Sequence, residues 1–392
     1  MYKLKELISG VSSAEGFFSD GVSAGLKPDG IKDMAFIYSD SLCEIASVFT
    51  TNKMTASPIR HFRAKGDFQT NFVLINSKNA NAMTGQAGIS DIEEILATLP
   101  KEVINPVMSS TGVIGVRIPK EKIIKGITTF NLSAKNPHEA SKAIMTTDSF
   151  SKEIAFEVLL EDGSSFKIGA MAKGAGMINP AMATMLCFIT TDAKVSKTEM
   201  QNILDEVTLT TFNAASVDGD TSTNDTVMLL SNAKSGAYNA EAFKEALHKI
   251  MLFLAREMVR DGEGATKLVT YNITGAKDNR EAEKVAKALS DSLLMKTALY
   301  GEDPNWGRIA STVGASGVEC SEESLTISFD TLCVYKEGEL FFDKAMEEKA
   351  SLVMKKDSFT ISCDLGIGDG SFRAFGCDLG YEYVKINADY RT

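Results

Sequence analysis

The chain has 392 residues, of which 44% are hydrophobic and 24% are charged, and its formal net charge at pH 7 is −11. Because a single hydrophobic core stops growing beyond ~250 to 300 residues, this length predicts two or three domains. The acidic balance argues against binding to nucleic acid or an anionic membrane, since both require a basic face, and small metabolites are the expected partners. No apolar run of ~18 residues and no apolar signal segment occur, which indicates the cytoplasm.

Six cysteines occur without any CxxC pair, and the three histidines form no HExxH motif. The sequence also lacks a GxSxG elbow and a GxxxxGK[ST] loop. Unpaired cysteines in a chain of this length are expected to be reduced and mostly buried. We therefore expect no metal site, no cofactor and no histidine-based catalytic triad.

Short apolar runs fill the first third of the chain, separated by Gly, Asn, Ser and Thr. They predict strands at 34–38, 44–49 and 72–75. Ser90 is expected to cap a helix that begins SDIEEILATL. The segment 76–85, NSKNANAMTG, is expected to form a loop held by side-chain caps, because Asn and Gly favour left-handed turns.

Thr111 and Gly112, in the sequence SSTGVIG, stand at a predicted turn from a strand to a helix. Such a turn could present a hydroxyl and a backbone N–H to one oxygen atom, as an oxyanion requires. A Thr-Gly turn is more often purely structural, so the residues alone leave both interpretations open. Helices are predicted at 120–127 and from the cap Asn136 to about Asp148.

The stretch 173–193, KGAGMINPAMATMLCFITTDA, combines a glycine-rich turn, a proline and the apolar run MLCFI. Thr184 stands where this run, a predicted buried strand at 185–189, begins. Two interpretations are open from the residues alone. Thr184 is either an ordinary residue at the start of a strand, or a nucleophile that cleavage after Ala183 would expose together with a new α-amine.

The capping box of Ser196 and Glu199 predicts a helix through about 214. The segment 217–226, VDGDTSTNDT, has the alternate spacing of a calcium loop but lacks the required glycine and the final glutamate. We therefore expect a polar loop that supports an active site. Asn239 is expected to cap a long amphipathic helix.

From about residue 278 onward Glu and Lys become more frequent, which predicts a smaller α/β domain to the end of the chain. An amphipathic helix is expected at 281–299. The segment 366–372, GIGDGSF, is interpreted as a hairpin turn, because no helix follows it as a nucleotide-binding loop would require. The strands expected in this domain lie near 325–329, 359–363 and 371–374.

Long motifs recur along the chain in a fixed order, and together they resemble the ornithine acetyltransferase family, the ArgJ-type glutamate N-acetyltransferases. The resemblance covers nearly the whole chain. The motifs are GVSAGLKPDGIKD, FTTNKMTASP, SSTGVIG, KGAGMINPAMATML, DGDTSTNDT, DGEGATK and GEDPNWGRI.

The resemblance implies self-cleavage between Ala183 and Thr184, giving fragments 1–183 and 184–392. Thr184 would then be the nucleophile and its own α-amine the base, since an amine with a pKa near ~8 can accept the hydroxyl proton without a histidine. Thr111 and Gly112 would form the oxyanion hole. The implied reaction is a ping-pong transfer of acetyl from N2-acetyl-L-ornithine to L-glutamate, and the resemblance leaves open whether acetyl-CoA also serves as donor.

The resemblance further implies a set of substrate-binding residues. We expect Lys173 to meet a substrate carboxylate and Glu263 to meet a cationic amino group, although the two assignments could be exchanged. The implied substrate-binding residues are Thr147, Lys173, Thr184, Glu263, Asn387 and Thr392.

The fold implied is an αββα sandwich over 1–277 with a smaller C-terminal α/β domain over 278–392, and relatives pair two copies of each fragment as a heterotetramer. The alternatives are an N-terminal-nucleophile aminopeptidase or amidase of related fold, which would pass the acyl group to water, and a non-catalytic binding protein for small molecules.

Overall fold

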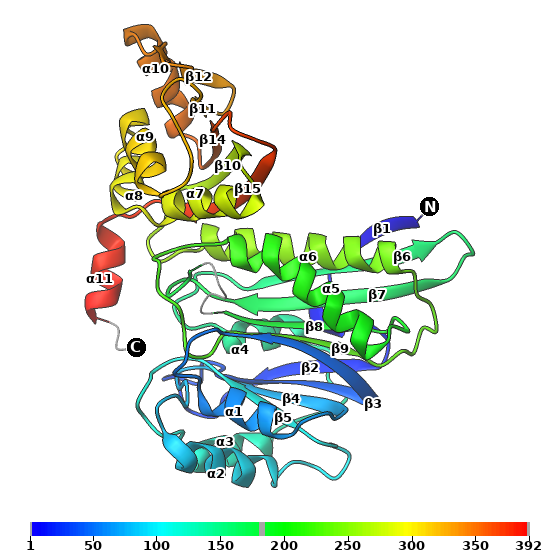
Figure 1. Cartoon of the computed structure of the whole chain (residues 1–392). Coiled ribbons are helices and arrows are strands. Elements are labelled where there is room, and N and C mark those ends of the chain that lie inside the picture. The colour runs from blue at the N-terminus through cyan, green and yellow to red at the C-terminus, as the bar shows by residue number, and fades with distance from the viewer. Residues whose placement is uncertain (1, 180–184, 390–392) are drawn as a thin grey trace.

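The computed structural model describes residues 2–179 and 185–389. Figure 1 shows a large body of sheets and helices, with a smaller group of strands and helices and the C-terminal helix α11 (Tyr381–Asp389) attached to it. Ala183, Thr184 and Thr392, on which several predictions fall, lie outside the described residues. Within the described residues, no helix is long and apolar enough to cross a membrane.

The large body is built from two sheets that share one long strand. The first sheet runs in the order β1 (Tyr2–Leu7), β6 (Lys152–Leu160), β7 (Ser165–Lys173), β8 (Leu186–Thr191), β9 (Thr226–Ser231) and β3 (Met34–Phe49). The second contains β2 (Phe17–Val22), β3, β4 (Thr70–Asn76) and β5 (Val107–Ser110). The first half of β3 pairs with β2 and β4, and its second half pairs with β9.

Helices cover the outer faces of both sheets (Figure 1). On the first sheet lie α5 (Lys197–Thr210) and α6 (Ala240–Arg260). On the second lie α2 (Gly85–Leu96) and α3 (Lys120–Ile127), with α1 (Ser57–Ala64) against α2 and β5. The helix α4 (Pro137–Ile144) packs on β2 and β3 and adds to the core between the sheets. The expected αββα sandwich is therefore confirmed.

Alternation along the strands explains the layers, because successive side chains of a strand point to opposite faces. In β3, Phe36 packs in the core under α2 and α3, whereas Ile37 packs in the core between the sheets. In β8, Phe188 faces the other sheet and Ile189 faces α5 and α6. Each sheet buries apolar side chains on both faces and therefore requires a helical layer outside.

The C-terminal part is an α/β layer with its own core. Its sheet runs in the order β13 (Glu339–Leu340), β12 (Leu332–Lys336), β11 (Thr326–Phe329), β14 (Ser358–Asp364), β10 (Leu268–Ala276) and β15 (Gly370–Cys377). Its helices are α7 (Asn279–Asp291), α8 (Leu293–Tyr300), α9 (Trp306–Ala315) and α10 (Lys344–Met354). The sheet begins with β10, ahead of the position 278 where the second domain was expected to start.

The predicted strands are present, with one difference in the first third. The runs 34–38 and 44–49 belong to the single strand β3, because the chain stays extended through a register shift between Tyr38 and Cys43. The strand predicted at 72–75 lies within β4, and the run predicted at 185–189 forms β8.

Helix starts were predicted well where a side chain caps the helix. Ser196 accepts a hydrogen bond from the N–H of Glu199 at 3.3 Å, and Asn239 accepts one from Ala242 at 2.9 Å. Helix α3 also has the predicted bounds. The prediction of Ser90 as a cap was wrong, because α2 begins five residues earlier at Gly85 without a side-chain cap.

Two predictions in the C-terminal part were wrong. The helix expected at 281–299 is two helices, because Ser292 has extended backbone and its side chain caps α8. The segment 366–372 is not a hairpin turn, since β14 and β15 do not pair with each other: β10 lies between them, parallel to β14 and antiparallel to β15. The strands expected near 325–329, 359–363 and 371–374 are confirmed.

Candidate active site

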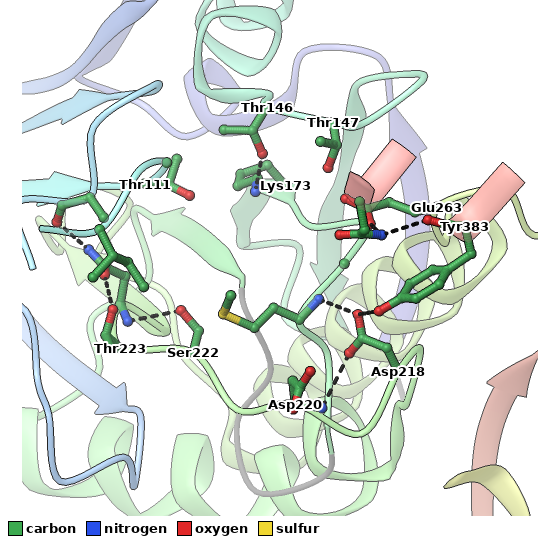
Figure 2. A pocket seen from close by; sticks show the side chains of 17 residues that line it. Thr111, Thr146, Thr147, Lys173, Asp218, Asp220, Ser222, Thr223, Glu263 and Tyr383 are labelled. Atoms are coloured by element: carbon green, nitrogen blue, oxygen red, sulfur yellow. Dashed lines mark hydrogen bonds between the residues drawn. The ribbon is translucent and has the colours of Figure 1, made fainter. Parts of the chain in front are cut away.

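A cavity of about 160 Å³ lies where loops of the sandwich meet helix α11 (Figure 2). Its lining includes every described residue that the sequence predicted for catalysis or substrate binding: Thr111, Gly112, Thr147, Lys173, Glu263 and Asn387. These residues come from five separate segments of the chain. Ala183, Thr184 and Thr392 are the predicted site residues that lie outside the described part.

Thr111 and Gly112 form a tight turn directly after β5. The backbone N–H of Thr111 donates to the carbonyl of Asn76 at 3.0 Å, so the group that Thr111 can present to a ligand is its hydroxyl. Gly112 has a φ of 132°, and a Cβ there would lie 2.2 Å from the carbonyl carbon of Lys78. The turn therefore requires glycine at this position.

Lys173 ends β7 with its ammonium group buried beside the cavity. Its Nζ donates to Thr146 Oγ1 at 2.7 Å and lies 3.8 Å from Asp148 Oδ2. Burial lowers the pKa of Lys173 from its ordinary value, and Asp148 opposes that shift. Burial alone would raise the pKa of Asp148, but Lys173, Lys152 and backbone N–H groups outweigh it and hold that pKa well below its usual range. Asp148 is therefore ionised and supports a charged Lys173.

Glu263 follows the end of α6 and contributes a carboxylate to the cavity. Its backbone N–H donates to the carbonyl of Ala175 at 2.8 Å, and its Oε2 accepts from Asn387 Nδ2 at 2.7 Å. A Cβ at Gly176 would lie 2.6 Å from the Glu263 carboxyl carbon. The glycine-rich turn after Lys173 thus leaves room for this carboxylate.

Asp218 and Tyr383 line the cavity and were not predicted as site residues. Asp218 accepts hydrogen bonds from the backbone N–H groups of Met177 and Ile178 at 2.6 and 2.9 Å, and from the Tyr383 hydroxyl at 3.2 Å. Burial raises the pKa of Asp218 and that of Tyr383 above their ordinary values.

The polar loop 217–226, which the sequence predicted to support an active site, lines the cavity. Its residues Asp218, Asp220, Ser222, Thr223 and Asn224 line the cavity. Asn224 Nδ2 donates to the carbonyl oxygens of Ala80 and Ser110, at 2.7 and 2.8 Å, and so fixes the loop against the strand that leads to Thr111. No individual residue of the loop could be singled out from sequence, because its contacts are made to distant segments, such as those of Asp218 to Ile178 and of Asn224 to Ala80, 40 and 144 residues away.

The start of β8 lies beside Lys173. Leu186 is the register partner of Lys173, and the backbone N–H of Met185 donates to Asp225 Oδ1 at 2.9 Å. Asp225 is fully buried, and burial raises its pKa well above the ordinary value. The residue that follows Thr184 in sequence is thus fixed next to the cavity wall.

The fold and the site together define a mixed α/β protein with an αββα sandwich, whose polar cavity holds a buried ammonium and separate carboxylates. Such a cavity suits a small molecule that carries charges of both signs. The ArgJ family model matches residues 19–392. The chain belongs to the ArgJ family, and the predicted assignment as a glutamate N-acetyltransferase enzyme is confirmed with that membership.

Curated relatives match the chain over nearly its full length. The arginine biosynthesis bifunctional protein ArgJ of Wolinella succinogenes is 59% identical, with 100% of both chains covered. The protein of the same name from Synechocystis sp. is 40% identical, with 97% of this chain and 98% of the relative covered. The chain is accordingly an arginine-biosynthesis protein of the acyltransferase class.

Among solved structures, the arginine biosynthesis bifunctional protein ArgJ from Bacillus halodurans is 40% identical. That match covers 51% of this chain and 97% of the other, with a TM-score of 0.48.

Proposed function

We propose that the chain is a self-processing acetyltransferase that moves the acetyl group from N2-acetyl-L-ornithine to L-glutamate, with Thr184 as nucleophile. The observation that carries the proposal is the convergence of Thr111, Gly112, Lys173 and Glu263 on one cavity, next to the start of β8. These residues lie up to 152 positions apart in the sequence, between Thr111 and Glu263.

Maturation begins with attack of the Thr184 hydroxyl on the carbonyl carbon of Ala183. The peptide C–N bond breaks, an ester forms, and the nitrogen becomes the α-amine of Thr184. Water then hydrolyses the ester, which releases the carboxylate of Ala183 and leaves fragments 1–183 and 184–392. The hydrogen bond from Met185 to Asp225 supports this role for Thr184, because it anchors the strand immediately after the cleavage point.

In the transfer reaction, the Thr184 hydroxyl attacks the acetyl carbonyl while the α-amine accepts its proton. The hydroxyl of Thr111 and the N–H of Gly112 stabilise the oxyanion. Ornithine leaves as the amine, taking the proton. The amino group of glutamate then attacks the Thr184 ester, giving N-acetylglutamate and the free hydroxyl.

The two charged sides of the cavity suit both substrates. Lys173 binds a substrate carboxylate, and Glu263, with Asn387 bonded to it, binds a cationic amino group. N2-acetyl-L-ornithine carries one charge of each sign at opposite ends. Thr147, which lines the cavity beside Lys173, and Thr392 complete the proposed substrate contacts.

The experiment compares the wild type with Thr184→Ala and Thr184→Ser on a denaturing gel and in an acetyl-transfer assay. We expect the wild type to give two fragments and to form N-acetylglutamate. Thr184→Ala should stay uncleaved and lose transfer by more than about 1,000-fold, while Thr184→Ser, which keeps a hydroxyl, should retain cleavage. Full activity in an uncleaved chain would contradict the mechanism.

The product separates the alternatives. Release of free acetate with no N-acetylglutamate would indicate an amidase, and ligand binding without processing or turnover would indicate a binding protein. Acetyl-CoA as the only donor tests whether this chain is bifunctional, as the names of its relatives state for them. We further propose a cytoplasmic heterotetramer of two copies of each fragment, which native mass spectrometry can test.

A further inference from the structure

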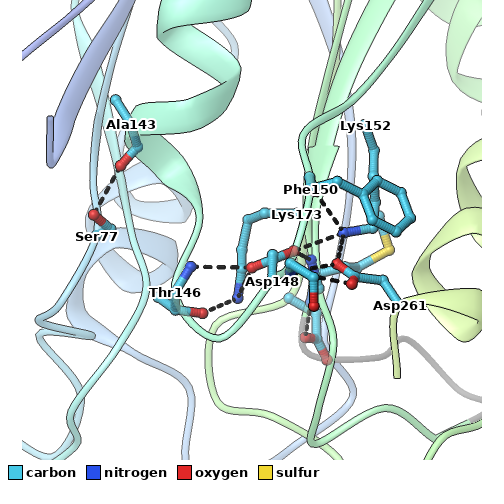
Figure 3. Close-up of polar contacts among 12 residues, drawn as sticks. Ser77, Ala143, Thr146, Asp148, Phe150, Lys152, Lys173 and Asp261 are labelled. Carbon is cyan, nitrogen blue, oxygen red and sulfur yellow. Dashed lines mark hydrogen bonds and ion pairs between the residues drawn. The ribbon is translucent and has the colours of Figure 1, made fainter. Parts of the chain in front are cut away.

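Lys173, which lines the cavity, belongs to a cluster of four buried charged side chains, and the other three lie behind the cavity wall (Figure 3). Lys152 Nζ lies 2.9 Å from Asp148 Oδ1 and 2.5 Å from Asp261 Oδ2, and Lys173 Nζ lies 3.8 Å from Asp148 Oδ2. Each of these side chains is at most 3% exposed. Two ammonium groups and two carboxylates make the cluster neutral, which is the condition under which buried charges are tolerated.

Asp148 occupies the centre of this cluster and uses both carboxylate oxygens. Its Oδ1 accepts from Lys152 and from the backbone N–H of Gly174 at 2.6 Å. Its Oδ2 accepts from the backbone N–H of Thr146 at 3.0 Å and faces Lys173. Lys173 also donates to Thr146 Oγ1 at 2.7 Å. Asp148 therefore acts on the Lys173 ammonium in two ways, directly through its own carboxylate and indirectly by holding Thr146.

Asp261 extends the cluster to the other charged side of the cavity. It accepts from the backbone N–H of Ser149 with both oxygens, at 3.1 and 3.0 Å, and pairs with Lys152. Asp261 stands two residues before Glu263. The loop with Thr146, the end of β7 and the segment with Glu263 are therefore joined by one set of buried charges.

Asp148, Lys152 and Asp261 are absent from the lining of the cavity. They cannot contact a substrate there, and the reaction proposed above does not use them. A buried ion cluster is weak evidence for stability by itself, because well-packed apolar residues often serve as well. The cluster contacts Lys173 and Thr146, which do line the cavity, so it can influence the cavity as well as stability.

We propose that Asp148 is a positioning residue that holds the Lys173 ammonium charged and aimed into the cavity, and that Lys152 and Asp261 keep Asp148 in place for this task. This inference rests on the proposed function in one respect, namely that Lys173 binds a substrate carboxylate. The charged groups that act on Lys173 include Asp148, Lys152, Glu263 and Asp225, together with the ammonium of Lys27. Among them, Asp148 is the carboxylate with an ion pair to its ammonium in the described residues.

The test is the titration of Lys173 in Asp148→Asn, an isosteric change that removes the charge. Protein labelled with 13C at lysine Cε is followed by NMR without substrate, and the Lys173 signal is assigned by its loss in Lys173→Met. We expect the midpoint of the Lys173 titration to fall by at least about one pH unit in Asp148→Asn. Asp40→Asn, which removes a partly exposed partner of Lys234, should leave it unchanged.

Kinetics supply a second measurement on the processed enzyme. In Asp148→Asn we expect KM for the carboxylate-bearing acceptor to rise about 10- to 100-fold at neutral pH, with a smaller change in kcat. The loss should shrink as the pH is lowered, because acid restores the charge on Lys173. A cluster with a purely structural role would lower the melting temperature without this dependence on pH.

The double variant Asp148→Asn with Lys152→Met covers the case in which the single variant does not fold. It removes one charge of each sign, so the cluster stays neutral, yet Lys173 still loses its partner. Because the Lys152 charge lowers the Lys173 pKa, the double variant is compared with Lys152→Met alone. An unchanged Lys173 titration in folded Asp148→Asn, or in the double variant relative to Lys152→Met, overturns the positioning role. Because the titration needs no turnover, absence of acetyl transfer in the wild type would contradict the proposed function and leave this measurement decisive for Asp148.

Discussion

Two walls of the same cavity are attached to the molecule in different ways. The lysine wall, Thr146, Thr147 and Lys173, lies where the loop between α4 and β6 meets the end of β7, and it is backed by the buried charges of Asp148, Lys152 and Asp261. The helix wall, α11, has no buried side chain among its residues 381–389. It is joined to the cavity by the hydrogen bonds from Tyr383 to Asp218 and from Asn387 to Glu263.

Because of this difference, one side of the cavity can stay rigid while the other opens to admit a ligand. Opening the lysine wall requires separation of the buried ion pairs behind it, which is costly because each charge would be left without its partner. Opening the helix wall requires the loss of a few partly exposed contacts, and local openings of this kind cost far less. Under the proposed function, the substrate carboxylate would therefore be bound by Lys173 on the rigid side, while entry and release are expected at α11.

The largest effect is expected from Lys152→Met in the lysine wall. Removing this ammonium leaves Asp148 and Asp261 buried without their shared partner, which costs about 3–5 kcal/mol. Thermal and denaturant unfolding measure the loss. The control is Lys249→Met, since Lys249 pairs with Glu245 on the surface at 2.7 Å and its loss should cost less than about 1 kcal/mol. Equal losses in the two variants would mean that the lysine wall does not depend on this cluster.

A smaller effect, on binding alone, is expected from Tyr383→Phe in the helix wall. The change removes the hydroxyl that donates to Asp218 at 3.2 Å. One such hydrogen bond contributes about 1 kcal/mol. We expect KM to rise by about 3- to 10-fold and the melting temperature to stay within about 1 °C of the wild type. Tyr381→Phe, on the same helix but 81% exposed, is the matched control. A melting temperature lowered as far as in Lys152→Met would contradict the distinction between the walls.

The smallest effect is a difference in pH dependence between Asp148 and Asp218. The pKa of Asp148 is lowered, so its contribution to stability is complete above its ordinary value and is lost as the pH falls below that value. Burial raises the pKa of Asp218, so its ionisation costs stability as the pH rises above the ordinary value.

Unfolding of Asp148→Asn and Asp218→Asn between about pH 4 and 7 measures this difference. Relative to the wild type, the stability lost by Asp148→Asn should change with pH only where Lys173, now without its partner, titrates. Asp218→Asn should gain relative stability as the pH rises, by less than about 1 kcal/mol. A slope in Asp148→Asn that does not follow the Lys173 titration measured by NMR would show that the Asp148 carboxylate of the wild type titrates in this range.

Local features of the sequence predicted local structure. Ser196 and Asn239 were correctly predicted as caps, because a cap is a local contact. The side chain of each accepts a hydrogen bond from the backbone N–H three residues later. The start of α2 was missed because Thr84 Oγ1 donates to Asn81 Oδ1 instead of capping the helix. The prediction of a hairpin turn at 366–372 was wrong for a different reason. Strand β10, which lies between β14 and β15, comes from about a hundred residues earlier in the chain.

The described site residues that the resemblance supplied all line one cavity, but the sequence did not show what holds them. Thr146 accepts from the Lys173 ammonium and Asp218 accepts from the backbone N–H of Met177, and no spacing in the sequence encodes those contacts. Tyr383 lies on a helix without a buried face, so its pattern carries no sign of a packed or functional side. Geometry was needed to find these three residues.

The position of β15 has a consequence for synthesis of the chain. In the C-terminal sheet β15 pairs with β10, with Leu268 opposite Cys377, and α11 follows within a few residues. Pairing over such a separation is slow, and domains fold in the order in which they leave the ribosome. The sandwich can therefore form while translation continues, but the helix wall is made more than a hundred residues after α6, the last helix of the sandwich. A ribosome-bound nascent chain would carry the lysine wall complete and the cavity still open on its other side.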